Sequence, residues 1–155
     1  MSTPEPTIRM ATPADRDLLV AFGRAMALET EQLDLDLDTV RAGVAALLAD
    51  PARGRVFIAD VGGEPAATLM LTDERSDWRN GFFWRIQSVY DAPAHRRRGL
   101  YRMLHEHVRD LAARTDGVYG LRLYVERENH TAQATYLRMG MYETHYRLYE
   151  QSVRG

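Results

Sequence analysis

The sequence predicts a single α/β domain over residues 1–155, with helices on both faces of one mixed sheet. The length suits one compact domain. Strand-like and helix-like segments follow one another in the order β-α-α-β-β-β-α-β-α-β, which is typical of a sheet covered by helices. The chain also has no internal repeat, low-complexity segment or linker at which it would divide.

The first third of the chain predicts one short strand and two helices. "TIRM" is the strand. A helix follows over residues 12–29, because Thr12 suits the N-cap, Pro13 the first helical position and Asp15 the first turn. The acidic stretch "ETEQLDLDLD" then interrupts, and we expect a loop there. "TVRAGVAALLAD" is the second helix, and "PARG" stops it.

The middle of the chain predicts three consecutive strands, "RVFIADV", "EPAATLMLTDE" and "FFWRIQSVY". Gly62 and Gly63 join the first two, and such a pair is a strong signal for a two-residue hairpin turn. "SDWRNG" is the second turn. The third strand is nearly continuous in apolar residues, which indicates a place in the interior of the sheet.

The last third predicts helix, strand, helix and strand. Apolar residues at helical spacing begin at residue 100, and Gly117 ends that helix. "VYGLRLYV" is a buried strand. "NHTAQATYLRM" is a short helix with Asn129 as N-cap and Gly140 after its end. "YETHYRLYE" is predicted to close the sheet as a final strand.

Composition excludes several classes of function. All 20 basic residues are arginine, so lysine Schiff-base chemistry is excluded. The absence of cysteine excludes disulfides and thiolate chemistry. The net charge of −2 argues against a general nucleic-acid binder. No apolar run approaches the roughly 20 residues of a membrane span, and no signal peptide is recognisable. We therefore expect a cytoplasmic protein, without metal.

The segment "DAPAHRRRGLYRML" is the strongest candidate for a binding site. It joins a strand to a helix, and the first N–H groups of a helix attract anions. Gly99 lets the backbone approach a ligand, and the neighbouring arginines are phosphate donors. A diphosphate suits this chemistry. The alternative is a solvated helix start that happens to carry an arginine run.

The same residues support a resemblance to a known family. "RRRGLY", with Arg96 in the first position and Gly99 in the fourth, resembles the acyl-CoA pyrophosphate loop of GNAT (Gcn5-related) N-acetyltransferases. "SVYDAP" is similar to that family's splayed strand. "ENHTAQATYLRMGM", with Asn129 and Tyr136, is similar to its later helix. The resemblance implies a mostly antiparallel central sheet with a splayed strand pair.

The resemblance also implies a set of cofactor contacts. The loop backbone would hold the diphosphate of acetyl-CoA, and freed main-chain groups of the splayed strand would hold its pantetheine arm. Tyr101 departs from the family's Gly or Ala at the sixth loop position, and Asp91 replaces an apolar residue. The implied residues are Val89, Tyr90, Asp91, Arg96, Arg97, Arg98, Gly99, Leu100, Tyr101, Arg102, Asn129 and Tyr136.

For catalysis, the resemblance assigns Tyr136 as the general acid that protonates the departing thiolate. Glu31, expected in the acidic loop, is our candidate general base. Glu29, Gln87 and a chain of waters remain alternatives. The acidic stretch could equally be a solvated loop without a catalytic role.

The expected function is transfer of an acetyl group from acetyl-CoA to a primary amine by direct attack. The acidic stretch favours a cationic acceptor. A non-catalytic acyl-CoA-binding or sensing module on the same fold is the alternative, because fold does not fix function. A homodimer stays open, and we expect neither nucleic acid nor a membrane as a partner.

Overall fold

The structure is a computed structural model that describes residues 2–154. Backbone contacts divide the chain into two compact units, Met1–Tyr124 and Val125–Gly155, and each unit is described by itself. A five-stranded sheet with antiparallel and parallel pairs, flanked by helices, confirms the predicted α/β class. The expectation of one domain over residues 1–155 stays a prediction.

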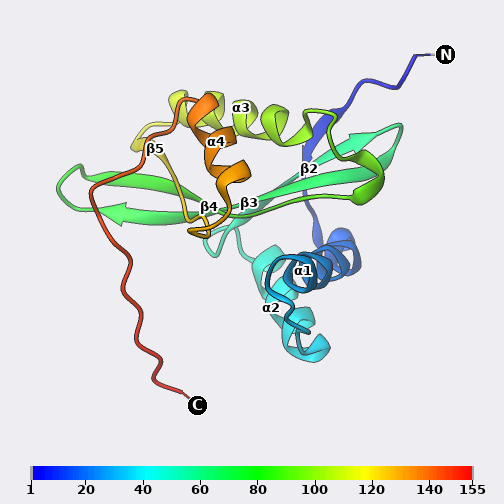
Figure 1. Cartoon of the computed structure of the whole chain (residues 1–155), viewed down its shortest axis with the longest axis horizontal. Coiled ribbons are helices and arrows are strands. Elements are labelled where there is room, and N and C mark those ends of the chain that lie inside the picture. The colour runs from blue at the N-terminus through cyan, green and yellow to red at the C-terminus, as the bar shows by residue number, and fades with distance from the viewer. Residues whose placement is uncertain (1, 155) are drawn as a thin grey trace. The chain divides into compact units, whose positions relative to one another are not determined.

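The first unit holds the sheet, in the order β1-β2-β3-β4-β5, and three of the helices (Figure 1). The second unit begins after β5 and holds α4. The elements in chain order are β1 (Thr7–Met10), α1 (Arg16–Glu31), α2 (Leu37–Ala49), β2 (Arg55–Val61), β3 (Glu64–Ser76), β4 (Gly81–Asp91), α3 (Leu100–Ala113), β5 (Val118–Leu123) and α4 (His130–Arg138).

Helices cover both faces of the sheet in the first unit, α3 on one side and α1 with α2 on the other (Figure 1). Successive side chains of a strand point to opposite faces. On β2, Phe57 accordingly packs in the cluster that contains Leu104 of α3, whereas Ile58 packs in the cluster that contains Leu19 of α1. The core is therefore split by the sheet, and β2 and β3 contribute side chains to the clusters on both sides.

Most of the predicted elements are confirmed. Gly62 and Gly63 both adopt positive φ (60° and 79°), as a two-residue hairpin turn between β2 and β3 requires. Asn80 does the same in the turn before β4. β4 lies between β3 and β5, as its apolar sequence indicates. α3 ends at Ala113, earlier than the predicted end at Gly117.

The acidic stretch is partly helical, so the prediction that Glu31 lies in a loop is wrong. α1 continues through Glu31 and ends because Gln32 adopts a left-handed conformation, with φ of 53°. The Gln32 N–H then bonds to carbonyls of the last helical turn. Glutamate is a good helix former, and nothing in its own chemistry stops a helix. The loop before α2 is shorter than the sequence suggests.

The final strand predicted over residues 142–150 is also wrong. Within the second unit this segment runs as an extended chain to the C-terminus, without ladder pairing to any segment of residues 2–154 (Figure 1). Its tyrosines are exposed, Tyr142 by 82% and Tyr149 by 86%. An alternating sequence only favours an extended backbone, and a strand also needs a neighbour for its hydrogen bonds.

Candidate functional site

β4 loses one of its two neighbours halfway along its length. Its first half pairs in parallel with β5, from Phe82 opposite Val118 to Ile86 opposite Leu123. From there to Asp91 it pairs with β3 alone among residues 2–154. One side of the second half is therefore open to hydrogen bonding with a ligand.

A β-bulge marks the point at which β5 departs. Ser88 pairs with Met70 and Ile86 pairs with Leu71, so Gln87 is an extra residue on β4. A bulge bends its strand and increases the local twist. The bend at Gln87 gives a physical reason for the separation of β4 from β5. Gln87, one candidate for the general base, is exposed.

The alternation of the ladder shows which main-chain groups face the open side. The Ala92 N–H donates to the Ala66 carbonyl oxygen over 2.8 Å, toward β3. Because neighbouring residues of an antiparallel strand point their N–H and C=O groups to opposite sides, Tyr90 also faces β3. Val89 and Asp91 therefore direct their N–H and C=O groups toward the open side.

The loop after β4 leads to a helix start without a side-chain cap. Arg97 and Gly99 both adopt positive φ, 63° and 74°. Such left-handed residues turn backbone N–H groups into a concave surface that binds anions. Gly99 is the N-cap of α3, no side chain within residues 2–154 caps that helix, and a Cβ placed at Gly99 would meet open space. The first N–H groups of α3 are thus available to an anion.

The arginines of the loop point in different directions. Arg97 and Arg98 are exposed, and their side chains make no hydrogen bond or ion pair within residues 2–154. Arg102 forms an ion pair along α3 with Glu106, at 2.9 Å. The Arg96 guanidinium instead contacts Glu29 at the end of α1, with 2.6 Å between Nη2 and Oε2. Arg97 and Arg98 are the two arginines of the run that can turn toward a phosphate.

The side chains of Leu100 and Tyr101 turn away from the loop. Leu100 is 1% exposed and belongs to the core cluster beneath α3. The half-buried Tyr101 ring lies along the helix, with its hydroxyl 2.9 Å from Nδ1 of His105. Burial lowers the pKa of His105. These two residues therefore offer the loop their backbone N–H groups rather than their side chains.

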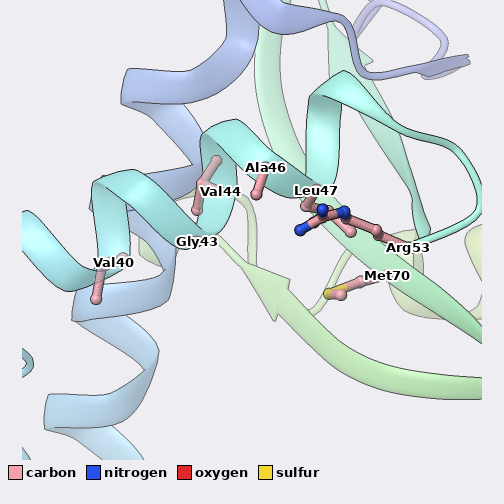
Figure 2. Close-up of a pocket in the computed structure, with 7 residues that line it drawn as sticks. All are labelled: Val40, Gly43, Val44, Ala46, Leu47, Arg53 and Met70. Atoms are coloured by element: carbon pink, nitrogen blue, oxygen red, sulfur yellow. The ribbon is translucent and has the colours of Figure 1, made fainter.

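Two neighbouring hollows lie beside α2. The larger, of about 450 Å³, is lined by Val40, Gly43, Val44, Ala46 and Leu47 of α2, with Arg53 and Met70 at one end (Figure 2). The smaller, of about 130 Å³, lies between α1, α2 and the sheet, and its lining includes Phe22, Met26, Ser88 and Tyr90. Ser88 and Tyr90 belong to the second half of β4, so this hollow adjoins the open strand segment.

The second unit contains the predicted short helix with its cap. The Asn129 side chain accepts a hydrogen bond from the Ala132 N–H over 3.1 Å, so its role as N-cap is confirmed. Tyr136 lies on this helix and is half-buried, and burial raises the pKa of its phenol above the usual value of 10.0. The phenol is therefore protonated at neutral pH.

The acidic candidates differ in their surroundings. Glu31 is exposed at the last position of α1. Glu29 contacts Arg96 and also accepts a hydrogen bond from the Tyr90 hydroxyl over 3.4 Å. The structure thus brings Tyr90, Asp91 and Arg96 together with Glu29, a grouping that the sequence analysis missed. Glu29 and Arg96 are 67 residues apart, and no local sequence signal connects them.

Two classes of feature are not found within residues 2–154. No group of three or more His, Cys, Asp or Glu side chains is arranged to hold a metal ion. No helix there is long and apolar enough to cross a membrane.

A family model described as "Acetyltransferase (GNAT) family" matches residues 21–141. This range includes the open segment of β4, the loop, α3 and α4. No curated protein matches the chain.

Solved structures share the fold. A possible acetyltransferase from Clostridium difficile 630 is 40% identical, with a TM-score of 0.92, over 97% of this chain and 99% of its own. A ribosomal-protein-alanine N-acetyltransferase from Brucella melitensis biovar Abortus 2308 is 16% identical, with a TM-score of 0.76, over 96% and 99%. An aminoglycoside N-acetyltransferase, AAC(6')-Iy, solved in complex with CoA, is 15% identical, with a TM-score of 0.78, over 99% and 98%.

Proposed function

Because this chain belongs to the GNAT acetyltransferase family, we propose that it transfers an acetyl group from acetyl-CoA to a primary amine. The observation that carries this proposal is the open half of β4 followed by the uncapped start of α3. Together they offer main-chain groups for an extended, amide-containing arm and N–H groups for a diphosphate. An acyl-CoA presents these two features in that order.

The proposed cofactor contacts follow from the directions of the groups. The backbone from Arg97 to Arg102 holds the diphosphate, with Gly99 leaving the approach clear. Arg97 and Arg98 supply charge beside it. The outward main-chain groups of Val89 and the N–H of Asp91 pair with the pantetheine arm, because the Asp91 carbonyl oxygen already accepts a hydrogen bond from Nε of Arg96. In this proposal, Leu100 and Tyr101 contact the diphosphate through their backbone N–H groups and not through their side chains.

The proposed reaction is direct attack of the amine on the thioester carbonyl, with no covalent enzyme intermediate. The amine nitrogen forms the new C–N bond, the C–S bond breaks, and the thiolate takes a proton from Tyr136. Glu31, or water leading to bulk solvent, removes the proton of the amine. Holding the two substrates together can lower the barrier by about 7–11 kcal/mol. An outward N–H of β4 that polarises the carbonyl adds to this.

We place the amine acceptor at the hollow between α1, α2 and the sheet. Its mostly apolar lining suits an apolar part of the acceptor, and two hydroxyl-bearing residues, Ser88 and Tyr90, line the same hollow. Glu29 and Glu31 at the end of α1 favour an acceptor that arrives as a cation. The chemical identity of this amine is the matter for experiment.

We also propose a cytoplasmic homodimer that needs no nucleic acid and no membrane. The C-terminal segment has a strand-type sequence and exposes the large side chains of Tyr142, Tyr146, Leu148 and Tyr149. Large exposed apolar side chains in a row are typical of a protein interface. Light scattering of the intact protein and of Tyr146→Ser/Leu148→Ser tests this, since the double variant should shift toward the monomer.

The decisive experiment measures acetyl-CoA turnover against a panel of amines, peptides and polyamines. Gly99→Glu places a negative side chain at the loop and should abolish CoA binding, whereas Gly99→Ala, which shares the strain of a positive φ, should weaken it far less. Tyr136→Phe should lower kcat by about 10²–10⁴ and leave CoA affinity unchanged.

Three results would go against the proposal. Unchanged CoA affinity in folded Gly99→Glu would move the diphosphate to another place. Full activity of Tyr136→Phe would remove the general acid. Tight CoA binding without turnover on any amine would favour the alternative, a non-catalytic acyl-CoA-binding or sensing module.

A further inference from the structure

The Arg96 side chain joins the loop to two other elements. Its Nη2 donates to Oε2 of Glu29 on α1 over 2.6 Å, and its Nε donates to the Asp91 carbonyl oxygen at the end of β4 over 3.0 Å. The guanidinium also lies over the Tyr90 ring, with its central carbon 5.6 Å from the ring centroid. One residue of the loop is therefore in contact with both α1 and the open half of β4.

The end of α1 receives a positive charge from outside the helix. Glu29 and Glu31 lie in its last turn, and that turn contains no basic residue. Negative charge is unfavourable there, because the helix dipole leaves a partial negative charge at the C-terminal end. Arg96 supplies the missing positive charge. The Tyr90 hydroxyl, 3.4 Å from Oε1 of Glu29, completes the cluster.

We propose that Arg96 is a positioning residue that couples binding of CoA at the loop to the order of the α1 end and of the acidic segment after it. The inference rests on the proposed function, since it takes the loop as the diphosphate site. A diphosphate that fixes the backbone next to Arg96 also fixes its guanidinium against Glu29. The end of α1 and the segment after it, residues 28–36, are then held more firmly.

The geometry favours coupling over a purely structural contact. The two side chains are 44% and 42% exposed, and an ion pair with this exposure contributes little to folding stability. The contacts nevertheless connect a ligand loop with a segment distant in the sequence. Coupling between two sites is reciprocal, so an acceptor that orders residues 28–36 strengthens CoA binding to the same extent. The guanidinium is needed because it donates from two nitrogens to two different acceptors.

Hydrogen exchange with CoA itself as the probe tests the proposal in the intact protein. Saturating CoA should slow exchange in the loop, and also in residues 28–36 by about fivefold or more, the lower end of typical coupling. In Arg96→Gln the slowing of residues 28–36 should disappear, while that of the loop remains. Glu29→Gln should do the same, and the double variant should show no additional loss.

Two further variants separate coupling from loss of charge. Arg98→Gln removes one positive charge two residues away, from a side chain that makes no hydrogen bond or ion pair with α1. It should weaken CoA binding and yet retain the slowing of residues 28–36 once CoA is saturating. Arg96→Lys keeps the charge and should restore part of the effect. With an acceptor in hand, Arg96→Gln should raise its KM more than the KM of acetyl-CoA.

The outcomes distinguish this inference from the proposed function. CoA that protects no segment of the protein would overturn both. CoA that protects the loop but leaves residues 28–36 unchanged would overturn the coupling alone. Equal loss of protection in Arg96→Gln and Arg98→Gln at saturating CoA would also overturn it, because charge and not the contact would then be responsible.

Discussion

The two halves of β4 differ in the number of strands with which they pair. The first half, up to Ile86, is paired on both sides, and Trp84 and Ile86 are 3% and 5% exposed. On its other face, the Glu74 carboxylate of β3 accepts hydrogen bonds from both Arg85 of β4 and Arg122 of β5, which ties three strands together. In this half, strands of the protein lie on both sides toward which the main-chain N–H and C=O groups point.

The second half keeps only one of these neighbours. After the bulge at Gln87, the strand is held by β3 and by the contact of Tyr90 with Phe22 of α1, whose rings lie 5.0 Å apart. Val89 leaves its N–H and C=O on the open side, and Asp91 leaves its N–H there, because its carbonyl oxygen accepts a hydrogen bond from Arg96. The first half is thus fixed by strands on both sides, whereas the second half keeps hydrogen-bonding groups that no neighbouring strand within residues 2–154 uses.

The largest effect is expected from a change in the rigid half. Trp84→Ala removes a buried ring that packs in the core and lies under the Arg55 guanidinium. Such truncations destabilise a fold by about 3–5 kcal/mol. Urea unfolding followed by circular dichroism measures the loss. CoA affinity of the protein that remains folded should not change.

Trp84→Phe provides the graded control, because it keeps an aromatic ring in the same place and should destabilise less. A different result would be that Trp84→Ala lowers CoA affinity strongly and yet unfolds at the same urea concentration as the unchanged protein. That result would show that the first half of β4 is not the structural half.

A smaller effect, chiefly on binding, is expected from Val89→Pro. Proline removes the N–H that faces the open side, where no ladder hydrogen bond of residues 2–154 depends on it. Loss of one such donor should weaken CoA binding about tenfold, equivalent to about 1.4 kcal/mol. Isothermal titration calorimetry measures the affinity, and urea unfolding measures the stability lost with the Val89 side chain, which packs against the core.

Val89→Ala is the matched control, because it keeps the N–H and gives up part of the side chain that packs against the core. It should lose some stability, as the proline variant does, but should retain its CoA affinity. If the two variants bind CoA equally well, the N–H of Val89 has no part in the site.

Most of the fold could be predicted from the sequence, because most elements have local signals. Alternation, turn residues and caps are local signals, and they placed β1 to β5 and α1 to α4 in the right order. The same alternation predicted a strand at residues 142–150, which is wrong, because pairing depends on a neighbour that a local pattern does not contain. Glu31 was placed in a loop for a related reason, since the left-handed turn at Gln32 has no sequence signal.

For the candidate site, the loop residues could be predicted and their contacts could not. "RRRGLY" locates the loop, yet nothing in it distinguishes Arg96, which contacts Glu29, from Arg98, which does not. The bulge at Gln87 likewise follows from the register of β3 against β4, which the sequence of one strand does not contain. The assignment of cofactor contacts and of Tyr136 stays a prediction.

The smallest effect is expected at the end of the open half, from Asp91→Asn. Burial raises the pKa of the Asp91 carboxyl above its ordinary value of 3.8, and the nearby Arg96 opposes this only in part. The folded protein therefore binds a proton at Asp91 more tightly than the unfolded chain does. Its stability falls as the pH rises from the ordinary value through the raised pKa, and stays lower above it. Asparagine has no charge to bury and removes this loss.

The stabilisation by Asp91→Asn should thus be present at neutral pH and disappear as the pH falls toward the ordinary carboxyl pKa. Asp15 supplies the opposite case: its hydrogen bonds with Arg9 lower its pKa, so its contribution is present at neutral pH and is lost as the pH falls through that lowered value. Urea unfolding of Asp91→Asn and of Asp15→Asn across this pH range measures the two trends. If Asp91→Asn instead destabilises the protein at neutral pH, the Asp91 carboxylate supports the fold. The part of β4 that is available to a ligand would then end before Asp91.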